Sequence, residues 1–274
     1  MSYKIYNRYG VKIHVYEFNP FIERLAVEIG IKDKLERPHL IPRPKPDEEV
    51  ASIINFNFFD WTGNSNNGYG EIEQNGIQLK PESKGFPSIS FKDGKLVLGD
   101  LKNAQMGVGI GATLILDGKI NIQNPSKVST GRDANTAIGQ KNNDNIIFVV
   151  AEGDDAKNKG VTSKELASFM LELGCRVAFQ GDRGGSSSMW CNGKYIYDQG
   201  RAVAACLVAY RKKTQKNNIY KVIASSLNVR HSPSLFGKVV DKYLKNTLVE
   251  ILETKNGWLK TNKGWISAKY AIKV

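Results

Sequence analysis

The sequence predicts an α+β protein, with a mixed β-sheet domain containing a β-α-β crossover over residues 1–210 and a small all-β barrel over residues 220–274. Two observations predict the first domain: apolar runs typical of strands, and one helix, between two such runs, whose start and end are both marked by capping residues. A third predicts the barrel, because the tail consists of short alternating strands separated by turns. Residues 211–219, which begin RKKTQKNN, are polar and charged and predict a linker.

The composition limits the class of protein. Hydrophobic residues make up 41% of the chain, enough for an ordinary core, and no run approaches the ~20 apolar residues of a membrane span. The N-terminus lacks the apolar run of a secretory signal, so we expect synthesis in the cytoplasm and no membrane span. Three widely spaced cysteines predict buried free thiols, and three scattered histidines leave acid–base chemistry to carboxylates.

The net charge of +12 is concentrated at the C-terminal end. Residues 220–274 carry ten Lys or Arg against three Asp or Glu, and RKKTQK at 211–216 adds four cations, so about +1 is left for residues 1–210. We therefore expect the tail to meet an anionic surface. Charge alone also suggests nucleic-acid binding, but the motifs of a nucleic-acid reader are absent, and we expect no nucleic-acid partner.

The first half of the chain is β-rich. VKIHVYEF at 11–18 alternates as a half-buried strand does, and IINFNFF at 53–59 follows a proline-rich segment that predicts a loop. SISFKDGKLVLG at 88–99 and ATLILDGKINI at 112–122 each place an Asp-Gly turn between two strands, which is a strong hairpin signal.

The clearest unit is a strand, a helix and a second strand. NIIFVVAEG at 145–153 has the pattern of a strand buried on both faces. The helix begins with Thr162 as N-cap and Glu165 as its capping-box partner and ends at Gly174, and RVAFQ at 176–180 is the next strand. We expect a right-handed crossover between parallel strands, which puts the following loop at the ligand-binding edge of the sheet.

The tail resembles a bacterial SH3 domain. The matching residues are Leu227-Asn228-Val229-Arg230 with Ser232-Pro233-Ser234, Gly257-Trp258 with Lys260, Gly264-Trp265-Ile266, and Tyr270. Such domains commonly attach enzymes to the bacterial cell wall. The resemblance implies a barrel that binds an anionic cell-wall polymer.

Residues 1–210 resemble the phosphodiester glycosidase family, whose known animal member removes the N-acetylglucosamine that covers mannose-phosphate tags. The matching segments, in the family's order, are Asn55 to Asp60, Thr136-Ala137-Ile138-Gly139, Glu152-Gly153, Gly160-Val161-Thr162 with Glu165-Leu166-Ala167, Gly181 to Ser187, and Arg201-Ala202-Val203. Three positions depart from the family pattern. Asn135 stands where the family has Arg, Glu152 replaces an Asp, and Arg183 stands within a glycine triplet.

The resemblance implies a sugar-phosphate diester as substrate, which needs donors for the phosphate and carboxylates near the anomeric carbon. We expect Asp182 to be a catalytic carboxylate, with Glu152 or Asp60 as its partner. Backbone N–H groups of the Gly-Gly-Ser-Ser turn would bind the anion. The expected substrate-binding residues are Asn55, Asn57, Arg132, Thr136, Gly139, Arg183, Gly184, Gly185, Ser186, Ser187 and Arg201.

Several of these residues also have a plainer structural interpretation. Asp182 would serve equally as the cap of a tight turn, Arg201 as a member of an ion pair, and Asn55 and Asn57 as parts of a β-bulge. The oxygens of Asp60, Asn57, Asn55 and Asp182 would suit Ca²⁺ or Mg²⁺, although no twelve-residue loop with regular ligand spacing occurs. The sequence itself requires no cofactor.

The two resemblances together predict a hydrolase that cleaves glycosyl phosphodiesters in a sugar-phosphate, cell-wall or capsular polymer, with the barrel as its targeting domain. The architecture also suggests a bacteriophage source, with the protein carried on the virion or released to the wall. The alternative is a non-catalytic glycan- or wall-binding protein of the virion, which is suggested by the departures at Asn135 and Arg183.

Overall fold

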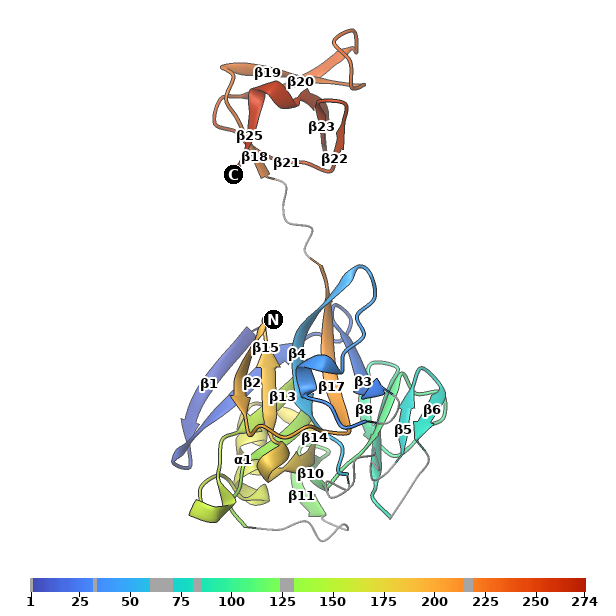
Figure 1. The fold of residues 1–274 in the computed structure, drawn as a ribbon, viewed down its shortest axis with the longest axis vertical. Coiled ribbons are helices and arrows are strands. Elements are labelled where there is room, and N and C mark those ends of the chain that lie inside the picture. The colour runs from blue at the N-terminus through green and yellow to red at the C-terminus, as the bar shows by residue number, and fades with distance from the viewer. Residues whose placement is uncertain (1, 32–33, 60–70, 81–84, 124–130, 214–218) are drawn as a thin grey trace. The chain divides into compact units, whose positions relative to one another are not determined.

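The computed structural model describes residues 2–31, 34–59, 71–80, 85–123, 131–213 and 219–274 (Figure 1). The chain divides into two compact units, Met1–Lys212 and Lys213–Val274, and each has a hydrophobic core of its own. No helix within these ranges is long and apolar enough to cross a membrane. All three cysteines are buried free thiols, as predicted.

A seven-stranded sheet lies at the centre of the first unit. In spatial order its strands are β1 (Ser2–Arg8), β2 (Val11–Phe18), β13 (Ile146–Ala151), β12 (Asn135–Lys141), β14 (Cys175–Arg183), β10 (Ala112–Leu116) and β11 (Lys119–Gln123). β13 is the strand predicted at 145–153, and it is buried on both faces. Because its side chains alternate, Phe148 and Val150 enter one core while Ile147 and Val149 enter another.

Helix α1 (Ser163–Glu172) packs on one face of this sheet and is the one α-helix among the described residues. Its start is the predicted capping box: Glu165 N donates to Thr162 Oγ1 over 3.2 Å, and Thr162 N donates to the Glu165 carboxylate over 2.9 Å. Leu166, Phe169 and Met170 are buried against the sheet. The helix is therefore fixed by its cap at one end and by an apolar stripe along its length.

The other face of the central sheet packs against a five-stranded sheet. Its strands, in order, are β16 (Lys194–Asp198), β15 (Ser188–Cys191), β4 (Glu48–Asn55), β17 (Ala205–Lys212) and β3 (Arg24–Ile29). The largest core lies between the two sheets and includes Phe148 and Phe179 from the first and Ile54 and Leu207 from the second. β17 extends to Lys212, so the first two residues of the predicted linker belong to a strand.

A third sheet and the tail complete the fold. The third sheet consists of β6 (Ile77–Lys80), β5 (Ile72–Gln74), β9 (Met106–Gly109), β7 (Ser88–Lys92) and β8 (Lys95–Leu98). The tail has two small sheets. One consists of β21 (Leu248–Glu250), β18 (Ile219–Val222) and β25 (Ala271–Lys273). The other consists of β20 (Val239–Leu244), β19 (Ser226–Arg230), β24 (Gly264–Ser267), β23 (Trp258–Thr261) and β22 (Glu253–Lys255). Val229, Leu259 and Ile266 are central in the tail core.

The predicted α+β class and its β-α-β crossover are wrong. The described part of the chain is nearly all-β, and its strands pair antiparallel throughout. β13 and β14, which flank the helix, do not pair, because β12 lies between them and is antiparallel to both. Continuous apolar runs are typical of parallel strands, but a strand of an antiparallel sheet is equally apolar when α1 covers one face and a second sheet covers the other.

Candidate active site

Two of the three predicted carboxylates, Glu152 and Asp182, lie at one edge of the central sheet. Because β12 is antiparallel to both β13 and β14, the last residues of those two strands lie at the same edge as the first residue of β12. Glu152 follows β13, Asp182 and Arg183 end β14, and Asp133 precedes β12. Asp60, the third predicted carboxylate, lies outside the described residues.

Asp182 is a buried carboxylate at the start of a turn. Its backbone N–H donates to Phe56 O over 2.6 Å, and its Oδ1 accepts from Arg183 N over 2.8 Å. Burial raises the pKa of the Asp182 carboxyl to about 6, although the Ser186 hydroxyl and the Arg201 cation both favour its anion. A carboxyl that titrates this close to neutral pH suits a general acid or base.

The 3-10 turn Gly184–Ser186 follows Asp182 and brings a cation to it. Arg201 Nη1 donates to Ser186 Oγ over 3.2 Å, and a Cβ on Gly185 would lie 2.5 Å from Arg201 Nη2. Gly184 has a φ of +61°, and a Cβ there would lie 2.8 Å from an Asp133 oxygen. The two glycines therefore let a guanidinium approach one side of the turn and a carboxylate approach the other.

Two amides of this turn are used within the fold. Gly184 N donates to Ala134 O over 2.9 Å, and Ser187 N donates to Gly184 O over 2.9 Å. These two donors are thus removed from the anion-binding turn that the sequence predicts. Arg201 is exposed and belongs to the segment before β17, and its guanidinium packs on the turn beside Asp182.

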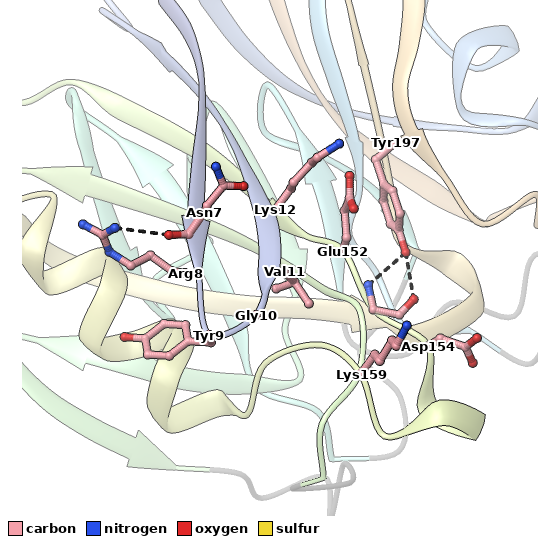
Figure 2. A pocket seen from close by; sticks show the side chains of 11 residues that line it. Asn7, Arg8, Tyr9, Gly10, Val11, Lys12, Glu152, Asp154, Lys159 and Tyr197 are labelled. Atoms are coloured by element: carbon pink, nitrogen blue, oxygen red, sulfur yellow. Dashed lines mark hydrogen bonds between the residues drawn. The ribbon is translucent and has the colours of Figure 1, made fainter.

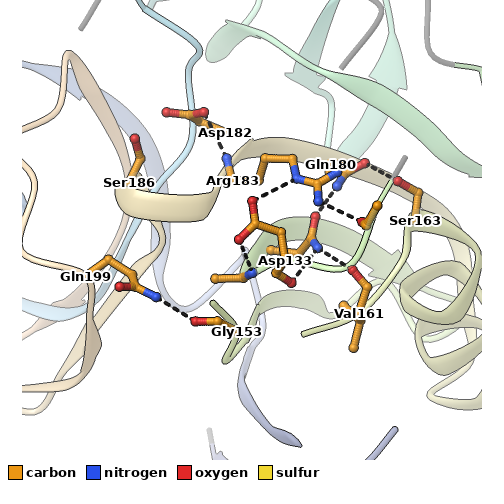
Figure 3. A network of polar contacts seen from close by, with 12 residues as sticks. Asp133, Gly153, Val161, Ser163, Gln180, Asp182, Arg183, Ser186 and Gln199 are labelled. Carbon is orange, nitrogen blue, oxygen red and sulfur yellow. Dashed lines mark hydrogen bonds and ion pairs between the residues drawn. The ribbon is translucent and has the colours of Figure 1, made fainter. Parts of the chain in front are cut away.

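Arg183 points away from the Asp182 carboxylate (Figure 3). Successive side chains of a strand face opposite sides, so a residue directly after Asp182 must point the other way. The Arg183 guanidinium is buried, lies 3.5 Å from Asp133 Oδ2 and donates to Gly131 O over 2.8 Å. Arg183, which stands within the family's glycine triplet, thus forms an ion pair with Asp133 on the side of the strand opposite Asp182. Asp133 is not among the site residues predicted from the sequence.

Arg132 and Gly139 are explained by the helix and its packing. Arg132 donates to Gly160 O over 2.8 Å and forms an ion pair with Glu165 of the capping box. Gly139 lies in the middle of β12, where a Cβ would be 2.8 Å from Met170 Cε of α1. Both positions therefore hold the helix against the sheet.

Asn55 connects the second sheet to the Asp182 turn. Its Nδ2 donates to Asp182 O over 3.3 Å, while its Oδ1 accepts from Thr136 Oγ1 over 2.8 Å and from Ser188 N over 2.9 Å. Both acceptor positions of that oxygen are used, which does not fit the predicted role of a metal ligand. Asn57 is buried. In the described ranges no three His, Cys, Asp or Glu side chains are grouped to hold a metal ion.

Glu152 ends a hydrogen-bonded chain that the sequence reasoning also missed. Its Oε1 lies 2.9 Å from Nε2 of the buried His14, whose Nδ1 lies 2.7 Å from the Tyr3 hydroxyl. The Tyr197 hydroxyl accepts from Gly153 N over 3.1 Å beside it. An inward-facing histidine in an apolar strand was the available signal, but its partner lies 138 residues away.

Comparison with known protein families assigns both parts of the chain. Residues 50–210 match the phosphodiester glycosidase family, and residues 225–271 match the bacterial SH3 domain. The chain belongs to the phosphodiester glycosidase family. Both resemblances seen in the sequence are thereby confirmed, and a hydrolase-like function is supported.

Individual relatives of this chain are distant. This chain is 29% identical over 144 residues to the SPbeta prophage-derived uncharacterized protein YomE of Bacillus subtilis (strain 168). The match covers 47% of this chain and 22% of that protein. Among solved structures, the chain is similar to the catalytic domain of zebrafish N-acetylglucosamine-1-phosphodiester alpha-N-acetylglucosaminidase, auto-inhibited by its pro-peptide. The TM-score is 0.61 at 17% identity, and the match covers 76% of this chain and 81% of the zebrafish chain. A hypothetical protein from Synechocystis has a TM-score of 0.60 at 13% identity, with 77% and 61% covered. These structural likenesses establish the fold.

The residues at which this chain departs from the family pattern have partners in the structure. Asn135, which stands for an Arg, donates to Asp133 O over 3.0 Å and to Val161 O over 2.8 Å, and its Oδ1 accepts from Gln180. It therefore ties the start of β12 to the segment before α1 and to β14. Together with the ion pair of Arg183, this network supports the Asp182 turn from behind (Figure 3).

Proposed function

We propose that the glycosidase domain hydrolyses a glycosyl phosphodiester, with Asp182 as general base and Arg201 as a phosphate ligand. The observation that carries the proposal is that both groups lie beside the Gly184–Ser186 turn: a buried carboxyl with a pKa of about 6 directly before it, and an exposed guanidinium that is bonded to Ser186. Membership of the phosphodiester glycosidase family supports the reaction class.

The two groups match the needs of this reaction. When the bond between the anomeric carbon and the phosphate oxygen breaks, the leaving group is a phosphate monoester, which needs its negative charge stabilised more than it needs a proton. Arg201 supplies a charge-assisted contact to that phosphate. Asp182 then removes a proton from the water that attacks the oxocarbenium-like anomeric carbon.

We further propose that the SH3 domain holds the enzyme on an anionic cell-wall polymer and that the protein reaches the wall on a virion or after lysis. The charge of the tail supports the first part, because ten Lys or Arg stand against three Asp or Glu. The prophage-derived relative supports the second.

The test is the replacement Asp182→Asn, assayed on the methyl phosphodiester of N-acetylglucosamine 1-phosphate and on phosphodiesters of other sugars. We expect kcat to fall by about 100-fold or more, as when a general base is removed. Wild-type activity should rise as pH increases through about 6, because a base must be ionised. Asp117→Asn, the same change at an exposed turn, is the matched control.

The outcome that contradicts the proposal is equal behaviour of wild type and Asp182→Asn on every diester. Sedimentation of both proteins with purified walls then separates the non-catalytic alternative, since binding without release of sugar identifies a wall-binding protein.

A further inference from the structure

A pocket of about 660 Å³ lies at the same edge of the central sheet as Asp182, between the β1–β2 hairpin and the segment after β13 (Figure 2). Residues 7–12 form one wall, and Glu152, Gly153, Asp154, Lys159 and Tyr197 form the rest. Residues 7–12 precede the region 50–210 that matches the glycosidase family. Part of this pocket is therefore built by a hairpin outside the matched region.

The pocket carries positive charge. Arg8, Lys12 and Lys159 line it, and within the described ranges none of the three is in an ion pair. Of its two acidic residues, Asp154 is neutralised by Lys157 at 2.9 Å. Cations that line a concave site concentrate anions there, because the low-dielectric walls focus their field.

One carboxylate in the pocket is held in a fixed orientation. Glu152 has a side chain 32% exposed, and its Oε1 is bonded to His14, which is 3% exposed. Burial raises the pKa of Tyr3 to about 12, so its hydroxyl keeps its proton and donates to His14 Nδ1. His14 Nε2–H then donates to Glu152. A carboxylate oriented in this way is an acceptor for a sugar hydroxyl, and the Tyr197 ring lies beside it (Figure 2).

The pocket and the Asp182 turn share a wall. A Cβ on Gly153 would lie 2.2 Å from Ala134 N and 2.4 Å from the Asp133 carbonyl carbon, so the pocket residue Gly153 packs directly on this segment. The Asp133 carboxylate in turn contacts Gly184 of the turn. A ligand that occupies the Asp182 turn therefore has the pocket as its next site along the sheet edge.

We propose that this pocket is a subsite for an anionic repeat of the substrate, which makes the substrate a polymer with phosphate in each repeat rather than a single glycosyl phosphodiester. Lys12 and Lys159 bind the anion, and Glu152 accepts from a hydroxyl of the same repeat. This inference rests on the hydrolysis proposed at Asp182 and names the substrate class of that site.

The kinetic test compares two substrates in the full-length protein. One is the methyl phosphodiester of N-acetylglucosamine 1-phosphate, which fills only the cleavage site, and the other is poly(N-acetylglucosamine 1-phosphate), which reaches the pocket. For Lys12→Ala combined with Lys159→Ala, we expect kcat/KM to fall at least tenfold on the polymer and to stay within twofold on the methyl diester. The matched control combines Lys102→Ala and Lys119→Ala, two exposed lysines outside the pocket.

Two kinetic results overturn the subsite: an equal loss on both substrates, or no loss on the polymer. If wild type cleaves neither compound, the hydrolysis at Asp182 has failed with these sugars, and the pocket is tested separately by binding. We then titrate the uncleaved polymer into ¹⁵N-labelled protein and follow the amides of Gly10 and Gly153. Shifts at both that disappear in the double-lysine variant support the subsite. Shifts confined to residues 219–274, or no shifts, overturn it.

Discussion

At the scale of single residues, Asp182 combines a chemical role with a cost in stability. Its folded pKa of about 6 exceeds the ordinary value of 3.8, so the folded chain holds the proton more tightly than the unfolded chain does. Stability therefore falls as pH rises from about 4 to about 6, and the full cost of the buried charge is present above that window. Such a cost is typical of residues kept for function.

We predict that Asp182→Asn stabilises the protein at pH 8 by up to about 3 kcal/mol, the equivalent of this pKa difference, while it lowers kcat by about 100-fold or more. Asn keeps an oxygen that accepts from Arg183 N. Most of the gain should be lost at pH 4, where the wild-type carboxyl is protonated in the folded state and partly protonated in the unfolded state. Urea unfolding at the two pH values measures it, with Asp117→Asn as control; destabilisation at both pH values would refute the prediction.

Gly185 leaves the space that the guanidinium of Arg201, the proposed phosphate-binding residue, occupies. A Cβ there would lie 2.5 Å from Arg201 Nη2, and Gly185 is not in the left-handed region of backbone space. We predict that Gly185→Ala displaces the guanidinium and raises KM about tenfold, the equivalent of one charge-assisted contact of about 1.4 kcal/mol. The free energy of unfolding should change little, because a flexible side chain yields. In an Arg201→Ala background the substitution should add nothing further; an additional loss would show that Gly185 acts otherwise.

At the scale of elements, the start of α1 is predictable and testable by itself. Thr162 accepts from Glu165 N, and Glu165 also pairs with Arg132. We predict that Thr162→Ala lowers the free energy of unfolding by about 1 kcal/mol, the usual value of an N-cap, and leaves kcat unchanged. Thr162→Ser, which keeps the hydroxyl, should remain within about 0.5 kcal/mol of wild type. Chemical denaturation measures both, and equal stabilities would mean that Glu165 and Arg132 alone hold the helix end.

The positions of the strands and of the helix along the chain can be predicted from the sequence more easily than the pairing of the strands. The strands at β2, β13 and β14 and the helix α1 follow from local periodicity and capping residues. Their partners do not, because a buried strand shows the same apolar run whether its neighbours are parallel or antiparallel. β12 precedes β13 by four residues and pairs with it, and β14 then pairs with the other side of β12 after the connection through α1. No local pattern in the sequence records that choice of partner.

At the scale of the whole molecule, two cores imply two separable units. The tail core includes Val229, Leu259 and Ile266, whereas the cores of the first unit draw on residues before 213. We predict that a protein ending at Lys212 folds, cleaves the methyl phosphodiester within twofold of the full chain and no longer sediments with purified walls. Calorimetry of the full chain should then show two transitions. Loss of the small-substrate activity on truncation would contradict this division.

The sequence by itself determined the family, the barrel-forming tail, the capped helix and the presence of Asp182 at a strand end, because each depends on residues close together in the chain. The tertiary structure alone decided which groups meet. Glu152 bonds to His14 across 138 positions, and Asn55 bonds to the backbone of Asp182 across 127. Arg183 points toward Asp133 for a reason that the glycine-rich motif does not contain: alternation along β14 turns its side chain away from Asp182, toward the segment just before β12 that carries the Asp133 carboxylate.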